Sequence, residues 1–205
     1  MKKLSLLLLL FSQFVFSQSV EEHAVEILKF QAELNREYRD VRETPLRGVN
    51  FKNFKEHPFF AVDFNYRIAA KFKRTENALP FEISTSSGHT KPYVEFGEAT
   101  FAVDGKNFML KIYQSVHLVQ KPEYKNHLFL PFHDATNGKE TYGGGRYLDL
   151  EIPSGDTVVL DFNKAYQPYC AYNAYDYSCP IVPTENTLPV AVKAGVRYED
   201  VYFIH

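Results

Sequence analysis

Tryptophan is absent from this 205-residue chain, and cysteine and methionine occur only twice each. No block of one charge sign stands out, because 23 basic and 25 acidic residues are interspersed and the net charge is −2. Proteins that bind nucleic acids carry basic patches, so we expect no nucleic-acid partner. The sequence also lacks a Walker loop, a dinucleotide fingerprint and a Cys-x-x-Cys spacing. We therefore expect no cofactor and no metal site.

Long apolar runs are also missing, apart from one at the N-terminus. Lys2 and Lys3 precede a mostly apolar stretch at residues 4–16, and Ser17 completes a small-residue cleavage site. This stretch is shorter than the ~20 residues of a spanning helix, and its flanks are typical of a secretory signal peptide. We predict a signal peptide at residues 1–17, a single globular domain at residues 18–205, periplasmic or secreted localisation, and no stable membrane span after cleavage. An uncleaved membrane anchor is the alternative.

Both cysteines, Cys170 and Cys179, lie in the part predicted to be exported. An even number of cysteines in an oxidising compartment indicates a disulfide bond. A metal site is the weaker alternative, since no histidine lies close to either cysteine in the sequence.

The order of predicted elements favours an α+β fold. A capping box at Ser19 and Glu22 begins an amphipathic helix whose apolar stripe includes Ile27, Leu28 and Tyr38. Strand-like stretches then follow at residues 66–73, 81–85, 92–103, 107–115, 128–132, 146–152, 157–162 and 188–192. Short strands separated by turns, with an Asp104-Gly105 hairpin signal, are typical of sandwiches and barrels. We expect an N-terminal helix packed on a mainly antiparallel β barrel-like or sandwich core.

One segment breaks this rhythm. Residues 163–189, here called the tyrosine loop, hold five tyrosines, four prolines and both cysteines. Such a composition fits neither a regular strand nor a regular helix, and a long loop in a compact domain is usually functional or disordered. Because its aromatic content argues against disorder, we expect the disulfide to fix this loop in place.

Three blocks of sequence resemble a known family. They are FHDATNGKETYGGGRYLDL at residues 132–150, LDFNKAY at residues 160–166, and CAY at residues 170–172 followed by Cys179-Pro180, Pro183 and Glu185-Asn186. In this order they resemble a bacterial family catalogued as domain of unknown function 1684. The family has no established activity, so the resemblance implies candidate positions and no chemistry.

The segment that ends in three glycines and Arg146 is the best candidate for a ligand site. Glycines allow close backbone approach, successive N–H groups can bind an anion, and an arginine can hold a carboxylate or phosphate. The tyrosines of the tyrosine loop can stack on a planar ligand. The candidate ligand-binding residues are Glu140, Tyr142, Gly143, Gly144, Gly145, Arg146, Tyr166 and Tyr172. The alternative is structural: a bend before a strand, with Arg146 paired to Asp149 or Glu140.

These observations favour a periplasmic or secreted binding module for a small polar or anionic ligand. A hydrolase-type enzyme is the first alternative, since a pair of carboxylates can act as general acid and base. The candidates for that pair are Asp134, Glu140, Asp149, Asp161 and Glu185, with His133 next to the first. A structural or assembly protein of the cell envelope is the second alternative. The sequence assigns no catalytic residue and leaves open whether the protein is an enzyme.

We predict that the mature protein begins at Gln18, because cleavage follows Ser17 in the pattern of charged, apolar and small residues. Intact mass measurement on protein recovered from the cell envelope or the medium checks this. An exported protein that retains Met1 would contradict the prediction.

Overall fold

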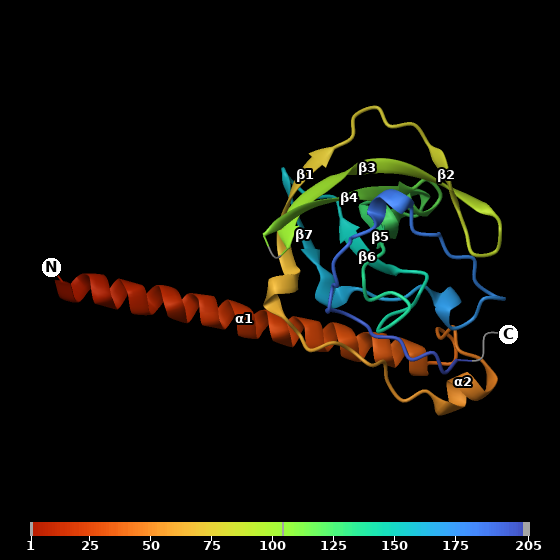
Figure 1. Cartoon of the computed structure of the whole chain (residues 1–205), viewed down its shortest axis with the longest axis horizontal. Helices are drawn as coiled ribbons and strands as arrows, with labels where there is room; N and C mark the ends of the chain where they lie inside the picture. The colour runs from red at the N-terminus through yellow and green to blue at the C-terminus, as the bar shows by residue number, and fades with distance from the viewer. Residues whose placement is uncertain (1, 104, 203–205) are drawn as a thin grey trace.

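The structure is a computed structural model that describes residues 2–103 and 105–202, with side chains from Val20 onward. Its elements, shown in Figure 1, are α1 (Lys2–Arg39), α2 (Gly48–Asn53), β1 (Arg67–Arg74), β2 (Phe81–Ser84), β3 (Thr90–Val103), β4 (Lys106–Ser115), β5 (His127–Phe132), β6 (Arg146–Glu151) and β7 (Thr157–Asp161), with short 3₁₀ turns between them. One N-terminal helix and a curled antiparallel sheet confirm the expected α+β class. The side chains of residues 1–19, which include the predicted signal peptide, lie outside the part of the chain that the structure describes. The signal peptide therefore stays a prediction.

The curl of the sheet follows from its topology. The strands lie in the order β6-β5-β4-β3-β1-β7, with β2 also paired to β3, and every pair is antiparallel. Only residues 152–156 join β6 to β7, which lie at opposite ends of this order. A flat sheet would separate these strands by about 24 Å at the usual spacing, whereas the link reaches roughly 21 Å when fully extended. The sheet therefore curls into the half-barrel seen in Figure 1.

The predicted hairpin lies between β3 and β4. Val103 pairs with Lys106, and Gly105 has a φ of +73°, the left-handed conformation that this turn requires. Asp104 itself lies outside the described residues. Further along β3, the register shifts between Glu95 and Gly97, and this bulge adds to the local twist.

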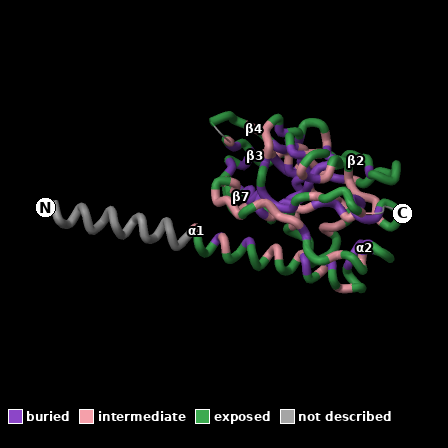
Figure 2. The backbone as a smooth tube through the Cα atoms, turned by 60° about the horizontal axis from the view of Figure 1, so that its bottom comes forward, coloured by how far each residue is buried: buried purple, intermediate pink, exposed green. Residues whose placement is uncertain are grey.

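Side chains alternate along the strands, so residues of one strand pack on both faces of the sheet. On β5, Leu128 and Leu130 are fully buried in the main core inside the curl. Figure 2 shows buried residues gathered within the curled sheet. Phe129 points to the other face and packs in a second cluster with Tyr147 of β6 and with Val182 of the tyrosine loop. The tyrosine loop is therefore a cover for the outer face of the sheet.

Helix α1 packs on the domain through the predicted face, except at Leu28. Ile27 and Tyr38 are buried as expected, but Leu28 is 57% exposed. The buried face carries His23, whose Nε2 lies 2.7 Å from Oδ2 of Asp161 at the end of β7. Asn35 on the same face accepts a hydrogen bond from a backbone N–H. Polar partners on the domain thus decide which side of the helix faces inward. The helix also runs through Ser19, so the capping box does not mark its start.

The predicted strand at residues 188–192 is wrong. Pro189 has no N–H to donate to a ladder. The Val192 N–H donates to the Asp134 carboxylate, and the Val192 carbonyl accepts from Arg146. This segment is an irregular strap: Leu188 and Val190 bond to the backbone of His133 and Ala135, but buried side chains take the backbone groups of Val192 that a strand would pair.

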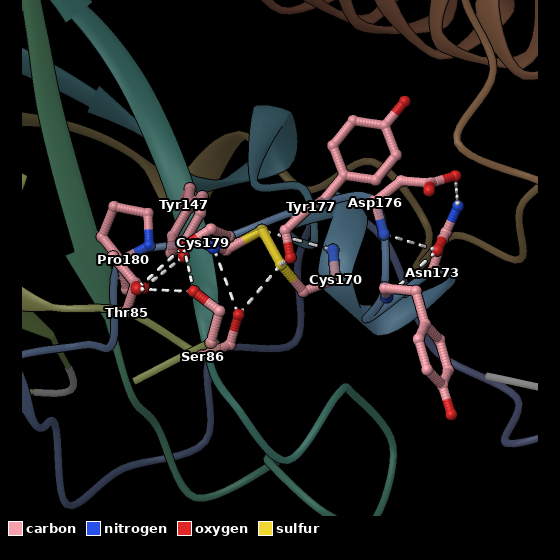
Figure 3. The surroundings of a disulfide bond; sticks show 12 residues. Thr85, Ser86, Tyr147, Cys170, Asn173, Asp176, Tyr177, Cys179 and Pro180 are labelled. Atoms are coloured by element: carbon pink, nitrogen blue, oxygen red, sulfur yellow. Dashed lines mark hydrogen bonds between the residues drawn. A yellow bond between two sulfur atoms is a disulfide. The ribbon is translucent and has the colours of Figure 1, made fainter. Parts of the chain in front are cut away.

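A disulfide bond between Cys170 and Cys179 closes part of the tyrosine loop, with 6.1 Å between the Cα atoms. The turn after β2 holds the bond in place, as Figure 3 shows: the Ser86 hydroxyl donates to Cys170 Sγ and accepts from the Cys179 N–H, both at 3.2 Å. Pro180 forms a bridge to Thr85 and accepts a hydrogen bond from the Tyr147 hydroxyl. The loop is therefore attached to two strands as well as to itself.

We predict that the Cys170→Ser, Cys179→Ser double variant loses about 2–3 kcal/mol of unfolding free energy, the chain-entropy value for so short a loop. Hydrogen exchange should rise most between residues 163 and 186 and should extend to the end of α1, because Tyr172 packs on Tyr38. The long β3–β4 ladder should keep its protection.

Urea unfolding and hydrogen-exchange mass spectrometry measure the two effects. The Ser178→Ala variant is the control, because it alters a neighbouring residue and keeps the bond. Two free thiols in denatured, unreduced wild-type protein would contradict the bond itself.

Candidate functional site

The glycine loop, residues 138–145, leads directly into β6, whose first residue is Arg146. Arg146 is fully buried and points into the protein rather than toward solvent. Its Nη2 donates to Asp134 Oδ2 at 2.7 Å and to the Val192 carbonyl at 2.8 Å, and its Nη1 donates to the Ala194 carbonyl. Burial lowers the pKa of Arg146, and the Asp134 carboxylate opposes this shift. The guanidinium is therefore an internal connector in this structure and is not offered to a ligand.

Asp134 completes this connection. Its Oδ1 accepts hydrogen bonds from the Thr136 N–H at 2.9 Å, from the Thr136 hydroxyl at 2.6 Å and from the Val192 N–H at 3.2 Å. A buried ion pair is tolerated when its remaining polar atoms are also satisfied. These bonds supply that condition for the carboxylate, whereas Nε of Arg146 is buried without a hydrogen-bond partner among the described residues. The sequence had offered Asp149 and Glu140 as structural partners of Arg146, whereas the partner is Asp134.

Of the three glycines, Gly145 is the one that combines a positive φ with close neighbours, whereas at Gly144 a Cβ would lie 2.4 Å from the Tyr142 ring. Gly145 has a φ of +89°, and a Cβ there would lie 2.6 Å from Val182 Cγ2 and 2.8 Å from the Phe132 carbonyl oxygen. Gly143 and Gly144 are exposed. The first of these has open space around it, so its backbone is accessible.

The tyrosine candidates are divided between two places. Tyr166 lies with Tyr147 on the outer face of the sheet and donates to Asp149 Oδ2 at 2.8 Å. Tyr142 and Tyr172 both contact Tyr198, with ring centroids 5.3 Å and 5.9 Å from its ring. The structure thus brings the glycine loop and the tyrosine loop together, but a residue from the C-terminal segment lies between them.

The candidate carboxylates are scattered, and each has a different partner. Asp134 binds Arg146, Glu140 lies 3.4 Å from Lys193 Nζ, Asp149 binds His127 and Tyr166, Asp161 binds His23, and Glu185 accepts from the Tyr113 hydroxyl. His133 Nδ1 lies 3.1 Å from the Asn137 side-chain oxygen. Within the described residues, these contacts join no two of the five carboxylates into an acid–base pair.

A small cavity of about 170 Å³ lies where α2 meets the tyrosine loop. It is lined by Arg47, Gly48, Val49, Asn50, Tyr172, Asn173 and Asp176. Arg47 Nε lies 3.4 Å from Asp176 Oδ2, and both side chains are more than half exposed. Nη1 of Arg47 donates to the carbonyls of Thr44 and Leu46, so the backbone fixes the guanidinium at the rim. The cavity thus presents one fixed cation, one carboxylate and amide groups.

Tyr172, which lines the cavity, also belongs to a buried polar cluster. The Tyr172 hydroxyl donates to Gln167 Oε1 and lies 3.3 Å from His57 Nδ1. Burial raises the pKa of Tyr172 well above 10 and lowers the pKa of His57 to about 3, so both are neutral at physiological pH. Asn173, next in the chain, donates to the Pro45 carbonyl and to Asp176 Oδ2, which orders the acidic side of the cavity.

Sequence reasoning found only Tyr172 among the residues that line the cavity. Arg47 and Asp176 are 129 positions apart in the sequence, and neither lies in a recognisable motif. The tyrosine loop itself was a usable signal, because its aromatic content and its predicted disulfide indicated an ordered loop. Nothing in the sequence indicated that α2 would lie against it.

Among the described residues, no group of three histidine, cysteine or acidic side chains is arranged to hold a metal ion. In the same part of the chain, no helix has both the length and the apolar character to cross a membrane.

The curled antiparallel sheet, the helix packed beside it and the disulfide-closed loop define an α+β half-barrel domain. The chain belongs to the family described as "Protein of unknown function (DUF1684)", which matches residues 52–197. The uncharacterized protein from gene locus rrnAC0354 of Haloarcula marismortui has a similar structure, solved by NMR in solution. The two chains are 31% identical with a TM-score of 0.68, over 88% of this chain and 97% of the other. No curated protein matches the sequence.

We predict that Arg146→Ala lowers the free energy of unfolding by about 3–5 kcal/mol, because it leaves the Asp134 carboxylate buried without its cation. The control variants Lys139→Ala and Glu151→Ala alter exposed side chains and should stay within about 0.5 kcal/mol of wild type. Urea unfolding followed by circular dichroism measures all three.

A double variant, Arg146→Met with Asp134→Leu, separates the charge effect from lost packing. It should be more stable than Arg146→Ala, because no uncompensated charge remains in the core. If Arg146→Ala proved as stable as the two control variants, the pair would not have the central structural role described above.

Proposed function

We propose that the protein is an exported binding protein for a small polar or anionic ligand, and that the cavity between α2 and the tyrosine loop is its site. The observation that carries the proposal is the cavity itself, where the guanidinium of Arg47 is fixed beside the carboxylate of Asp176. An arginine held by backbone carbonyls keeps free donors for an anionic group of a ligand. Asp176 and Asn173 provide acceptors and donors for its polar groups.

The size of the cavity limits the ligand. Drug-sized molecules occupy pockets of about 300–1,000 Å³, whereas an engineered cavity of about 150 Å³ holds benzene. A volume of about 170 Å³ therefore fits a ligand of roughly six to eight non-hydrogen atoms. A short carboxylic acid, a small amino acid or a fragment of a sugar has this size and polarity.

Export is the second part of the proposal. It is supported by the N-terminal sequence pattern and by the disulfide bond, since structural disulfides persist in oxidising compartments. The ligand site also differs from the expected one: Arg146 is buried, so Arg47 takes over its proposed role as the anion contact.

A thermal-shift screen of short-chain carboxylates, amino acids and monosaccharides tests the binding site. A ligand at 100 times its Kd stabilises the native state by about 2.7 kcal/mol, which corresponds to roughly 5–10 °C in Tm for a domain of this size. Arg47→Ala should weaken binding about 10- to 100-fold, because a charged hydrogen bond is lost. Arg42→Ala is the matched control, since Arg42 is exposed nearby and pairs with Asp40.

A structural or assembly role is the second candidate, and the interior position of the Gly145–Arg146 segment favours it. In that case the family signature serves the fold alone. If no compound of the screen shifts Tm, or if Arg47→Ala and Arg42→Ala reduce a shift equally, the ligand proposal fails and this candidate replaces it.

A further inference from the structure

The C-terminal segment, residues 197–202, passes between the glycine loop and the tyrosine loop. Tyr198 is hydrogen-bonded to both: its N–H donates to the Glu140 carbonyl at 3.0 Å, and its hydroxyl donates to the Ala171 carbonyl at 2.7 Å. Tyr198 thus joins the glycine loop to the tyrosine loop through its backbone N–H and its hydroxyl. These two loops border the site expected from the sequence.

The ring of Tyr198 lies in an aromatic surround. Tyr142 and Tyr172 face it at interplanar angles of 70° and 71°, the edge-to-face arrangement that aromatic pairs prefer. Tyr202 stacks on it from the same segment, with centroids 5.8 Å apart. Two carbonyl acceptors and two flanking rings form a site that matches a hydroxyphenyl group with an adjacent N–H donor.

The backbone attachment of this segment weakens after Tyr198. Val196 donates to the Ala165 carbonyl at 2.9 Å and Arg197 to the Pro58 carbonyl at 2.8 Å. After Tyr198, the described backbone has one further hydrogen bond, from Val201 to Glu199 within the segment itself. Segments with few backbone hydrogen bonds open locally at low cost, and Tyr198 is only partly buried. The family match also ends at residue 197, so the surrounding loops belong to the family domain and Tyr198 lies just beyond it.

We propose that the space between Tyr142 and Tyr172 is a binding site for a hydroxyphenyl group, which Tyr198 occupies as an internal ligand. An external phenolic compound enters when the segment after Arg197 swings away, and its hydroxyl then donates to the Ala171 carbonyl. The C-terminal segment is thereby a built-in competitor. This proposal uses a different ligand, and of the residues that line the polar cavity it shares only Tyr172, so it does not rest on the proposed function.

Competition by the tethered residue sets the expected affinities. The apparent Kd of a ligand rises in inverse proportion to the fraction of molecules whose site is open. If fewer than about a tenth of the molecules are open, the wild-type protein binds at least tenfold more weakly than a variant without the Tyr198 side chain.

The experiment titrates N-acetyl-L-tyrosinamide into full-length mature protein and follows the backbone resonances by NMR. Tyr198→Ala should bind at least tenfold more tightly than wild type, with shifts centred on residues 140–142 and 171–172. Tyr175→Ala is the matched control, because the Tyr175 side chain is 77% exposed, and it should behave as wild type. In wild-type protein, saturating ligand should raise hydrogen exchange at residues 198–202.

Two further ligands define the chemistry. N-acetyl-L-phenylalaninamide lacks the hydroxyl and should bind Tyr198→Ala about three- to tenfold more weakly than the tyrosine compound. The compound 4-methylphenol keeps the hydroxyl but lacks the amide N–H that the Glu140 carbonyl accepts. Tighter binding of the tyrosine compound than of 4-methylphenol assigns the site to tyrosyl groups, and equal binding assigns it to free phenols.

The Tyr198→Phe variant keeps the test decisive if Tyr198→Ala does not fold. It retains the ring but loses the bond to Ala171, so it should bind the tyrosine compound about threefold more tightly than wild type. The proposal is overturned if a folded Tyr198→Ala protein binds none of the three compounds. It is also overturned if wild type binds as tightly as this variant, or if Tyr198→Phe binds no better than wild type when it is the only folded variant.

Discussion

The buried contact between Arg146 and Asp134 connects the parts of the domain that the sheet alone would leave separate. Arg146 begins β6 and Asp134 follows β5. Both bind the backbone of Val192, and Arg146 also binds the carbonyl of Ala194. A guanidinium can serve these partners together because its donors point in several fixed directions. The desolvation of two charges is tolerable only because the other polar atoms of the carboxylate are also paired. The family signature around residues 132–150 is therefore explained first by folding.

The tyrosine loop connects this interior to the surface. Its disulfide and the hydrogen bonds of Ser86 hold it against β2, while Val182 covers the outer face of the sheet. Its other side, around Tyr172, packs on α1 and borders the polar cavity and the Tyr198 site. One ordered loop thus positions both proposed sites.

Local sequence signals predicted the elements that depend on neighbouring residues. The Asp104-Gly105 pair predicted the β3–β4 hairpin, and the strand-like stretches at residues 128–132 and 146–152 predicted β5 and β6 to within one position. The prediction at residues 188–192 failed because Pro189 has no N–H to donate, and because Asp134 and Arg146, more than 40 positions earlier, take the backbone bonds of Val192. The face of α1 was misassigned at Leu28 for the same kind of reason, since Asp161 draws His23 inward.

The sequence by itself determined the family, the α+β class, the strand pattern and the cysteine pair, because periodicity, turn chemistry and ordered blocks of residues are local properties of the chain. Only the tertiary structure decided what the candidate site residues do. It buried Arg146, exposed Gly143, brought Arg47 to Asp176 and placed Tyr198 between two loops. Each of these outcomes depends on contacts between residues far apart in the chain, and the curl of the sheet and the path of the tyrosine loop create them.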